Sequence, residues 1–530
     1  MQNIDELRNK LSEMDRDELI NYTIEQQIAK EQYLEQLKIF RTKKFSKTSE
    51  KADPDQLSLF NEAEVILDEA SEEELDEASV APKPKKKQKN GKIDYSKLDV
   101  KTIHHELEDK TCKECGGTLK ETGTSTVEVL RYQPAKFYLE KHIIHNYECR
   151  NCGNEAKSED APAELIEGSR AGAEVVAAIA RDKFVLGTPL YRQEQDLKRR
   201  QIFIPRQNMS NWLIRCAEDY LEFVFEKMHR DIQKCDIVHM DETTLVVIED
   251  KNTRSKSYEW LLMSGMEEEK QMALYFYNET REHDTLEKLL TLRKDRYIIS
   301  DGYGAYHNEE YGINVGCMAH LRRYFYEAME ASVLDGEYKK LKESKEKKKF
   351  LEANPSYTNI LNIILVIQKI FDVDKKLREK PVEERKGIKE SESLPLLNVL
   401  FEDIKKLEDQ YTKKSKMGKA ITYALDQEKY IRNYMLDGRL EVSNNRAEQK
   451  IKPFVMARKN FLFSNTKRGA GSSSIYFSLI ESAIMNNLDP YKYLVHVLER
   501  LSKEGLKDSV IEEVLPYSQS LPKNLYTKSK

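Results

Sequence analysis

The first part of the chain places apolar residues at helical intervals. Ile4, Leu7 and Leu11 are three or four positions apart, and a second set with this spacing follows "DRDEL" and ends at Leu37. The spacing puts the apolar side chains on one face of a helix. The pattern predicts a helical hairpin or short coiled coil over residues 1–45. We expect this segment to join copies of the chain as a homo-oligomer, although packing against its own chain explains the pattern equally well.

Residues 165–232 keep a helical pattern in three pieces. The first piece ends at Gly187, the second begins at Pro189, and the third follows "IFIP". Glycine and proline are ordinary residues at helix boundaries. Three short helices with a basic middle piece resemble a helix-turn-helix module, although many helical bundles share this pattern. The arginines of this module expected to contact DNA are Arg199, Arg200 and Arg206.

From residue 236 the pattern changes to strands. The runs "DIVHMDETTLVVI", "SYEWLLMSG" and "QMALYFYN" are followed by a helix, the strand "YIISD", a short helix, the strand "INVGCMA" and a helix from His320. This order is that of a ribonuclease H-like fold and implies a mixed sheet with helices on its faces. Charged, helical residues at about 325–435 form an insertion. The core is expected over 233–465, and a helical region with a loosely ordered tail over 466–530.

Length and composition agree with several domains in one chain. The 530 residues suffice for more than one core, and the order above predicts an α+β multidomain protein. No run of 18 or more apolar residues occurs, so we expect no membrane span. The charged N-terminus is not a signal peptide. Seven cysteines, an odd number, argue against a secreted disulfide framework and favour the cytoplasm.

Charge is unevenly distributed along the chain. The net charge is −5, but residues 62–79 hold nine acids and no base, so the remainder would carry +4. Residues 82–92 then hold six lysines. Such blocks are usually linkers, which predicts an acidic and then basic linker over 46–100. A basic arm that touches DNA is the less favoured alternative for the lysines, and the two interpretations are compatible.

Two Cys-x-x-Cys pairs, separated by 33 residues, lie in a β-like segment over 101–160. Four thiolates suit the tetrahedral coordination of zinc, and a two-residue gap lets both sulfurs of a pair face one metal ion. Cytosolic disulfides are the alternative and are rare. We therefore predict a ribbon-like module with one structural Zn²⁺, closed to substrates. Its ligands would be Cys112, Cys115, Cys149 and Cys152.

Two carboxylates lie in or at the end of strands that are predicted to be buried. Asp241 lies in the strand that opens the predicted sheet, and Asp301 ends the fourth strand before Gly302 and Gly304. The first and fourth strands are neighbours in a ribonuclease H-like sheet, so the two acids would meet. Carboxylates held close repel each other unless cations lie between them, and two Mg²⁺ or Mn²⁺ ions are the usual answer. A surface turn is the alternative for Asp301.

A third acid is expected from the helix that follows the sheet. Glu448 lies in "LEVSNNRAEQKIKPFVMARKNFLF", residues 440–463, where Ser443 would cap the helix. A surface helix rich in ion pairs would look similar. The polar and basic residues around the acid, expected to contact DNA, are Asn444, Asn445, Arg446, Lys450, Arg458 and Lys459.

Taken together, the motifs resemble the IS66-type insertion-sequence transposases of the DDE class, over nearly the whole chain. The resemblance is carried by the leading helices, the paired cysteines and, in order, "QLSLFNEAE", "PLYRQE", "MDET", "SDGYGAY", "GCMAHLRRYF", "SNNRAE", "ARKNFLF" and "DPYKYL". It implies Asp241, Asp301 and Glu448 as the catalytic triad, two Mg²⁺ or Mn²⁺ ions per active site, and double-stranded DNA as partner. It also implies a bacterial, nucleoid-associated protein and small accessory proteins from the same element.

The resemblance implies a reaction and leaves alternatives. The implied enzyme cuts the ends of an insertion sequence to free 3′-OH ends and joins them to target DNA. An inactive DNA-binding regulator and a metal-dependent nuclease without strand transfer are the other interpretations. Cys317 and His320 are similar to a Cys-x-x-His element of some DDE families, and a core cysteine with a capping histidine is the alternative. His320, Arg322 and Arg323 are expected near the DNA.

Overall fold

A computed structural model describes most of the second half of the chain and parts of the first. The described residues are 137–143, 146–148, 155–157, 164–250, 257–281, 285–341 and 343–527. The predicted hairpin over 1–45, the linker over 46–100 and the four zinc-ligand cysteines lie outside these residues. Among the described helices, none combines the length and apolar character that crossing a bilayer requires.

Contacts divide the chain into two units, one of residues 70–161 and one of residues 1–69 with 162–530. In the smaller unit, β1 (Asn146–Glu148) pairs antiparallel with β2 (Glu155–Lys157). This short pairing is the described part of the segment that the sequence predicts to be β-like.

The larger unit is built on a mixed five-stranded sheet with the order β5-β4-β3-β6-β7. β3 pairs antiparallel with β4 and β4 with β5, whereas β6 runs parallel to both β3 and β7. The first and fourth strands of this sheet, β3 and β6, are neighbours, as predicted. The elements are β3 (Ile237–Leu245), β4 (Ser257–Ser264), β5 (Ala273–Asn278), α8 (Thr285–Leu289), β6 (Tyr297–Ser300), η5 (Gly304–His307) and β7 (Ile313–Gly316).

β5 is an edge strand of the sheet, and the serine-rich helix α17 (Lys467–Met485) packs along its free edge. The hydroxyl of Ser478 accepts a hydrogen bond from the Tyr275 N–H at 2.7 Å. The hydroxyl of Ser482 accepts from the Ala273 N–H at 2.9 Å and donates to the Ala273 carbonyl at 3.1 Å. Edge strands otherwise present unpaired backbone groups to other chains. These serines therefore satisfy three backbone groups of this edge.

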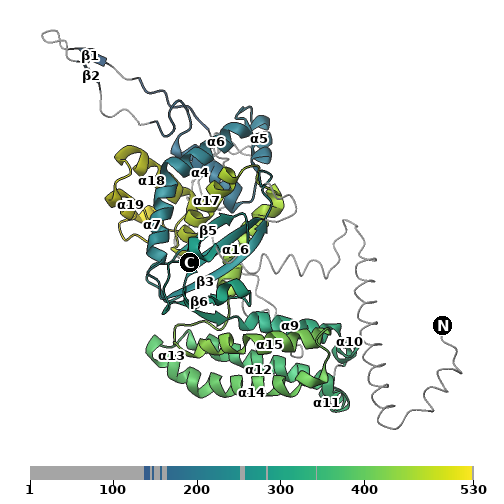
Figure 1. Ribbon diagram of the computed structural model, residues 1–530. Helices are drawn as coiled ribbons and strands as arrows, with labels where there is room; N and C mark the ends of the chain where they lie inside the picture. Colours follow the sequence, from purple (N-terminus) through teal and green to yellow (C-terminus); the bar gives the residue numbers. More distant parts are fainter. Residues whose placement is uncertain are drawn as a thin grey trace, which may run out of the picture. The chain divides into compact units, whose positions relative to one another are not determined.

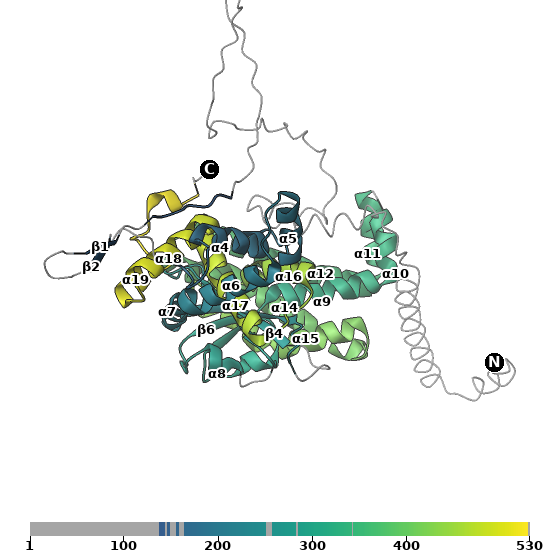
Figure 2. The same cartoon turned by 90° about the horizontal axis from the view of Figure 1, so that it is seen from above.

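Helices before and after the sheet pack together, with α4 against α18 and α6 against α17 (Figures 1 and 2). The predicted stop at Gly187 and restart at Pro189 are confirmed: Gly187 has a φ of +64° and Pro189 is the N-cap of α5. The elements are α4 (Ala173–Ala180), η3 (Arg181–Val185), α5 (Leu190–Arg199), α6 (Arg206–Cys216), η4 (Ala217–Leu221), α7 (Glu222–Ile232), α18 (Pro490–Glu504), α19 (Asp508–Glu513) and η9 (Lys523–Leu525).

The expectation of a loosely ordered tail is wrong as far as residue 527. Val514 and Leu525 are buried, and Leu488 forms a β-bridge with Tyr526. α19 contacts both α7 and α18. Apolar residues spaced irregularly gave no helical or strand pattern, but the tertiary structure supplies surfaces that bury them.

The residues between β7 and the last helices are helical, as predicted. Helices α9, α12, α14 and α15 pack side by side next to the sheet (Figure 1). Ile299 and Val315 of the sheet share one core with Ile367, Phe401 and Ala424 of these helices. The elements are α9 (Met318–Ala331), α10 (Val333–Lys340), α11 (Ser344–Ala353), α12 (Pro355–Leu377), α13 (Val382–Ile388), η6 (Lys389–Ser393), α14 (Leu394–Lys406), η7 (Glu408–Gln410), α15 (Lys416–Arg432), η8 (Asn433–Met435) and α16 (Asn445–Phe461).

A buried lysine ties this helical insertion to the segment that leads into α16. The Lys389 ammonium donates to the carbonyls of Tyr434, Asp437 and Leu440 at 3.1, 2.8 and 2.7 Å. Burial lowers the pKa of Lys389 to about 7. The insertion therefore fixes the backbone just before the helix that carries Glu448.

Candidate active site

Asp241 and Asp301 are brought together by the parallel pairing of β3 and β6. Paired residues of these strands differ by 60 in number, from Ile237 with Tyr297 to His239 with Ile299. The same offset continues to Asp241 and Asp301, which directly follows β6. The sequence prediction that these acids meet across neighbouring strands is therefore confirmed.

Glu448 joins the two aspartates from the first turn of α16, which packs against β3. The pKa of Asp241 is raised well above its ordinary value, first by burial and then by the negative charges of Glu242, Glu448 and Asp301. We call Asp241, Asp301 and Glu448 the acid cluster. The structure brings together the three acids expected from the sequence, whereas their catalytic role stays a prediction.

The two carboxylate oxygens of Glu448 have different surroundings. Oε2 accepts a hydrogen bond from the Arg323 guanidinium at 3.3 Å. Oε1 is buried without a hydrogen-bond partner and lies 3.5 Å from the Nδ1 atom of His320, which has no partner either. One oxygen of the carboxylate is therefore unsatisfied inside the protein.

The start of α16 is held by the sheet and not by a capping serine. The prediction that Ser443 caps the helix is wrong, because the N-cap is Asn444 and it makes no side-chain cap bond. The Asn444 amide instead donates to the Met240 carbonyl at 2.8 Å, and its Oδ1 atom lies 2.9 Å from the His239 ring. These bonds fix the first turn of α16 on β3.

A second group of charged residues lies beside this contact. Glu441 Oε2 is 2.7 Å from the His239 Nε2 atom and 3.2 Å from the Arg446 guanidinium. Burial alone would raise the pKa of Glu441, but His239 and Arg446 outweigh it and hold that pKa at about 2. We call His239, Glu441 and Arg446 the paired cluster. The sequence analysis missed it, although a histidine two residues before Asp241 on the same strand face was a usable signal.

Glu242, the fourth acid of this region, has partners of its own. Its carboxylate accepts hydrogen bonds from the Tyr306 hydroxyl and the Arg281 guanidinium. Arg281 also lies over the Tyr303 ring at 3.6 Å, and the Tyr303 N–H donates to Asp301 at 2.9 Å. Glu242 therefore anchors the loop that carries Asp301.

Gly302 and Gly304 follow Asp301, and glycines at such a place can let a bound ligand approach the backbone closely. A Cβ atom on Gly302 would instead lie 2.7 Å from the ring of Tyr423 in α15, whereas one on Gly304 would meet nothing within 4 Å. The insertion therefore packs directly on the loop after Asp301, which gives Gly302 a packing reason within the chain.

Comparison with known proteins identifies the family of the chain. Residues 168–472, more than half of the chain, match the family described as "Transposase IS66 family". The chain belongs to this transposase family. Further matches are the "zinc-finger binding domain of transposase IS66" at 109–153, the "IS66 C-terminal element" at 478–517 and the "Transposase C of IS166 homeodomain" at 32–99.

Three similar proteins come from Sinorhizobium fredii (strain NBRC 101917 / NGR234). The uncharacterized protein y4jD is 27% identical over 427 residues, which are 78% of this chain and 79% of the relative. The uncharacterized protein y4qI is 26% identical over 87% of this chain and 82% of its own length. The uncharacterized protein y4hP is 24% identical over 77% of this chain and 73% of its own length.

The family supports a transposase that binds zinc and DNA. The zinc-finger match spans the four predicted ligands, Cys112, Cys115, Cys149 and Cys152, whose geometry lies outside the described residues. Among the described residues, Cys216, Cys235 and Cys317 are buried free thiols.

Several residues expected at the DNA are in internal contacts in this transposase. Asn444 bonds His239, and Arg446 is part of the paired cluster. Lys450 bonds Glu481 at 3.1 Å. Arg458 donates to Thr243 and Thr244. Arg322 bonds Gln368 at 3.0 Å. The more exposed side chains of the predicted set are Arg199, Arg200, Arg206, Arg323, Asn445 and Lys459. Their contact with DNA stays a prediction.

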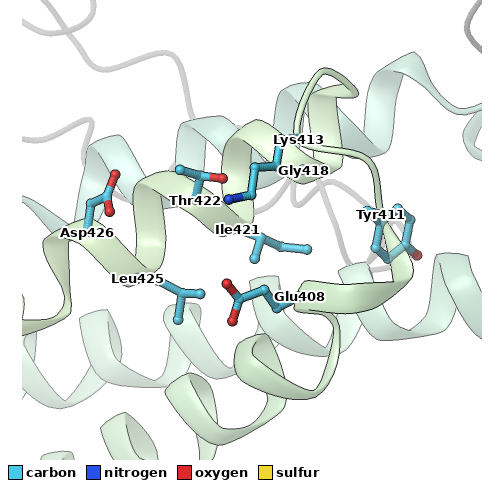
Figure 3. Close-up of a pocket in the computed structure, with 8 residues that line it drawn as sticks. All are labelled: Glu408, Tyr411, Lys413, Gly418, Ile421, Thr422, Leu425 and Asp426. Carbon is cyan, nitrogen blue, oxygen red and sulfur yellow. The ribbon is translucent and has the colours of Figure 1, made fainter.

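A shallow pocket of the insertion is separate from the acids. Figure 3 shows its side chains around α15 and the preceding loop. Its lining residues include Glu408, Lys413 and Asp426, and none of the acid cluster. Gly418 is required here because a Cβ atom would lie 2.0 Å from the Thr412 carbonyl.

The acid cluster fits hard divalent cations. Carboxylate oxygens are the ligands that Mg²⁺ and Mn²⁺ prefer. Burial and then the charges of the neighbouring acids raise the pKa of Asp241, and the Glu448 Oε1 atom lacks any hydrogen bond. Bound cations would relieve both conditions.

Proposed function

We propose that this transposase binds insertion-sequence ends, cleaves them to free 3′-OH ends and joins these to target DNA in a DDE reaction. The carrying observation is the convergence of Asp241, Asp301 and Glu448 from three elements on one point. The strand order and the adjacent β3 and β6 support a ribonuclease H-like core over 233–465.

The three acids would act as ligands for the catalytic cations. Two Mg²⁺ or Mn²⁺ ions, when bound, would activate the attacking water or 3′-OH and stabilise the attacking and leaving oxygens. Asp241, Asp301 and Glu448 would hold these ions together, because the charges of Asp301 and Glu448 both act on Asp241. Arg323, bonded to Glu448, lies where it can receive a DNA phosphate.

The turn between α5 and α6 is our candidate for end recognition, together with the zinc-finger segment. Phe203 is 76% exposed in this turn, and the Arg206 guanidinium lies 5.7 Å from the Tyr191 ring. Arginines suit phosphates, and an exposed ring can pack on bases. Arg199→Ala should reduce the salt dependence of DNA binding by about one phosphate contact, whereas Phe203→Ala should weaken binding with an unchanged salt slope.

Two other functions are compatible with the family. An inactive regulator would bind ends without nicking them, and a nuclease would nick without joining. The convergence of the acids favours an active site over the regulator. Homo-oligomers are part of the proposal through the helical pattern over residues 1–45, and accessory proteins of the same element through the family resemblance.

A cleavage-and-joining assay tests the proposal directly. The full chain is mixed with duplexes that carry the element's own ends and with plasmid target, with Mg²⁺, with Mn²⁺ or with chelator. We expect metal-dependent 3′-OH ends and joined products, both lost in Glu448→Gln. Nicked but never joined DNA would indicate the nuclease, and bound but intact DNA in every metal would indicate the regulator.

A further inference from the structure

A mixed set of donor atoms lies directly beside the acid cluster. The ligand atoms of Cys317, His320 and Glu448 all lie within 4.8 Å of one another. His320 Nδ1 and Glu448 Oε1 face each other at 3.5 Å, and both are buried without a hydrogen-bond partner. Two unsatisfied atoms that converge with a thiol need a common partner.

Two helix starts hold these donors in place. Cys317 is the N-cap of α9 and His320 is in its first turn, while Glu448 is in the first turn of α16. The Met318 N–H donates to the Val442 carbonyl at 3.0 Å, and the Asn444 N–H donates to the Cys317 sulfur at 3.2 Å. These bonds join the two helix starts, so the backbone segments that carry the donors are held together.

The donor chemistry and spacing fit zinc. Tetrahedral Zn²⁺ binds sulfur, nitrogen and oxygen at about 2.0–2.3 Å, which places ligands roughly 3.3–3.8 Å apart. The 3.5 Å between His320 and Glu448 already lies in this range. A thiolate does not suit Mg²⁺. His320 and Glu448 keep 21% and 23% of their side chains exposed, so a site formed by them would lie near the surface, and water would be its fourth ligand.

The second carboxylate oxygen and the sulfur have supporting contacts. Arg323 bonds Glu448 Oε2 and leaves Oε1 directed to His320. The backbone N–H of Asn444 would stabilise a thiolate at Cys317, as outer partners do in metal sites. Binding converts the Cys317 thiol to a zinc-bound thiolate and releases one proton to solvent, so zinc affinity should increase with pH.

We propose that Cys317, His320 and Glu448 form a Zn²⁺ site that shares Glu448 with the catalytic cations. Occupation of this site would direct Glu448 away from Asp241 and Asp301. Zinc would then inhibit Mg²⁺-dependent DNA cleavage. The binding site stands on its geometry, whereas the inhibitory effect rests on the proposed function.

Zinc content tests the site without any need for activity. The full chain, equilibrated with Zn²⁺ and passed through a desalting column, should hold about two Zn per chain, one of them in the predicted four-cysteine module. Cys317→Ser and His320→Ala should each hold one. Cys235→Ser, at a buried thiol in a different part of the fold, is the matched control and should still hold two. Two zinc ions retained in Cys317→Ser would overturn the proposal.

Folding and inhibition are measured on the same samples. Thermal unfolding in chelator should show Cys317→Ser folded, and if it is not, His320→Ala serves as the informative variant. Micromolar Zn²⁺ should inhibit Mg²⁺-dependent nicking by the wild type at least tenfold more than nicking by Cys317→Ser. Equal inhibition of both would refute the shared site. Loss of one zinc in Cys317→Ser from a chain that never cuts DNA would support the site and refute the proposed function.

Discussion

His239 and Asp241 lie two residues apart on one face of β3, yet their surroundings are opposite. In the paired cluster, His239 and Arg446 outweigh the burial of Glu441 and hold its pKa at about 2. In the acid cluster, burial and the charges of Glu242, Glu448 and Asp301 raise the pKa of Asp241. The same strand and the same helix start supply both clusters.

The two clusters differ in whether the chain itself supplies the opposite charges. The paired cluster has its counter-charges within the chain, so it stabilises the contact between β3 and the start of α16. The acid cluster lacks enough positive charge and needs cations from solution. Five predictions test this contrast, from the largest expected effect to the smallest.

Asp301→Asn should abolish most of the activity while leaving the fold intact. The amide keeps the shape but removes a charged ligand, and we expect cleavage and joining to fall by about a thousandfold or more. Cleavage-and-joining assays with thermal unfolding in chelator check both effects. Asp236→Asn is the control, because Asp236 pairs with Arg293 and Arg439. Normal transposition by Asp301→Asn would refute the acid cluster as the active site.

Glu441→Gln should damage stability more than any single change in the acid cluster. It leaves Arg446 and His239 without their buried counter-charge, which typically costs about 3 kcal/mol in the free energy of unfolding. Urea unfolding of both proteins measures the difference. Glu309→Gln removes an exposed acid paired with Lys429 and should leave the urea midpoint unchanged. Equal midpoints for wild type and Glu441→Gln would show that the paired cluster adds no stability.

Asp241→Asn should stabilise the fold, whereas Glu441→Gln destabilises it; the comparison is made in chelator. The folded pKa of Asp241 is raised above 3.8, so its ionisation costs stability that grows as the pH rises above this value. The variant should therefore unfold at a higher temperature than the wild type at pH 7, with the difference vanishing near pH 3.8.

The paired cluster reverses this pH dependence. The pKa of Glu441 is about 2 in the folded chain, below its ordinary 4.5, so its contribution is present above pH 4.5 and lost as the pH falls toward 2. The destabilisation in Glu441→Gln should shrink over that window. Thermal unfolding of the wild type and of each variant at several pH values measures both effects. The contrast is wrong if Asp241→Asn and Glu441→Gln shift the unfolding temperature in the same direction.

Tyr306→Phe should have the smallest effect. It removes the buried hydroxyl that donates to Glu242, which costs about 1–2 kcal/mol of stability. Because Glu242 anchors the loop of Asp301, we also expect a higher Mg²⁺ concentration for half-maximal cleavage, with little change at saturation. Tyr526→Phe, at a partly exposed ring, should leave the Mg²⁺ dependence unchanged. An unaltered Mg²⁺ dependence in Tyr306→Phe would remove its positioning role.

Much of the fold was predictable from local patterns. Strand periodicity predicted the five strands, and their ribonuclease H-like order predicted that the first and fourth are neighbours. Gly187 with Pro189 predicted a helix boundary that the structure confirms. The tail after α18 was not predictable, because Val514 and Leu525 have no regular spacing and are buried only by other helices. Nor did sequence predict the serine bonds of α17, since they depend on which helix reaches the edge of β5.

The residues of the candidate site also fall into a part that was predictable from sequence and a part that was not. Asp241, Asp301 and Glu448 stood out as acids next to strands and a helix start, but a surface turn or an ion-pair helix explained such acids too, and the family resemblance implied the triad. The roles of Asn444, Arg446 and Lys450 could not be read from sequence. A polar side chain near an acid looks alike whether it faces solvent or a buried partner.

The sequence by itself determined the strand and helix order, the two cysteine pairs and the three acids, because these depend on periodicity and residue type. Only the tertiary structure decided that His239 meets Glu441 and that Tyr423 fills the space at Gly302. It also decided that Cys317 and His320 converge on Glu448. These contacts join residues that are far apart in the chain, and their energies depend on burial and distance, which no local pattern encodes.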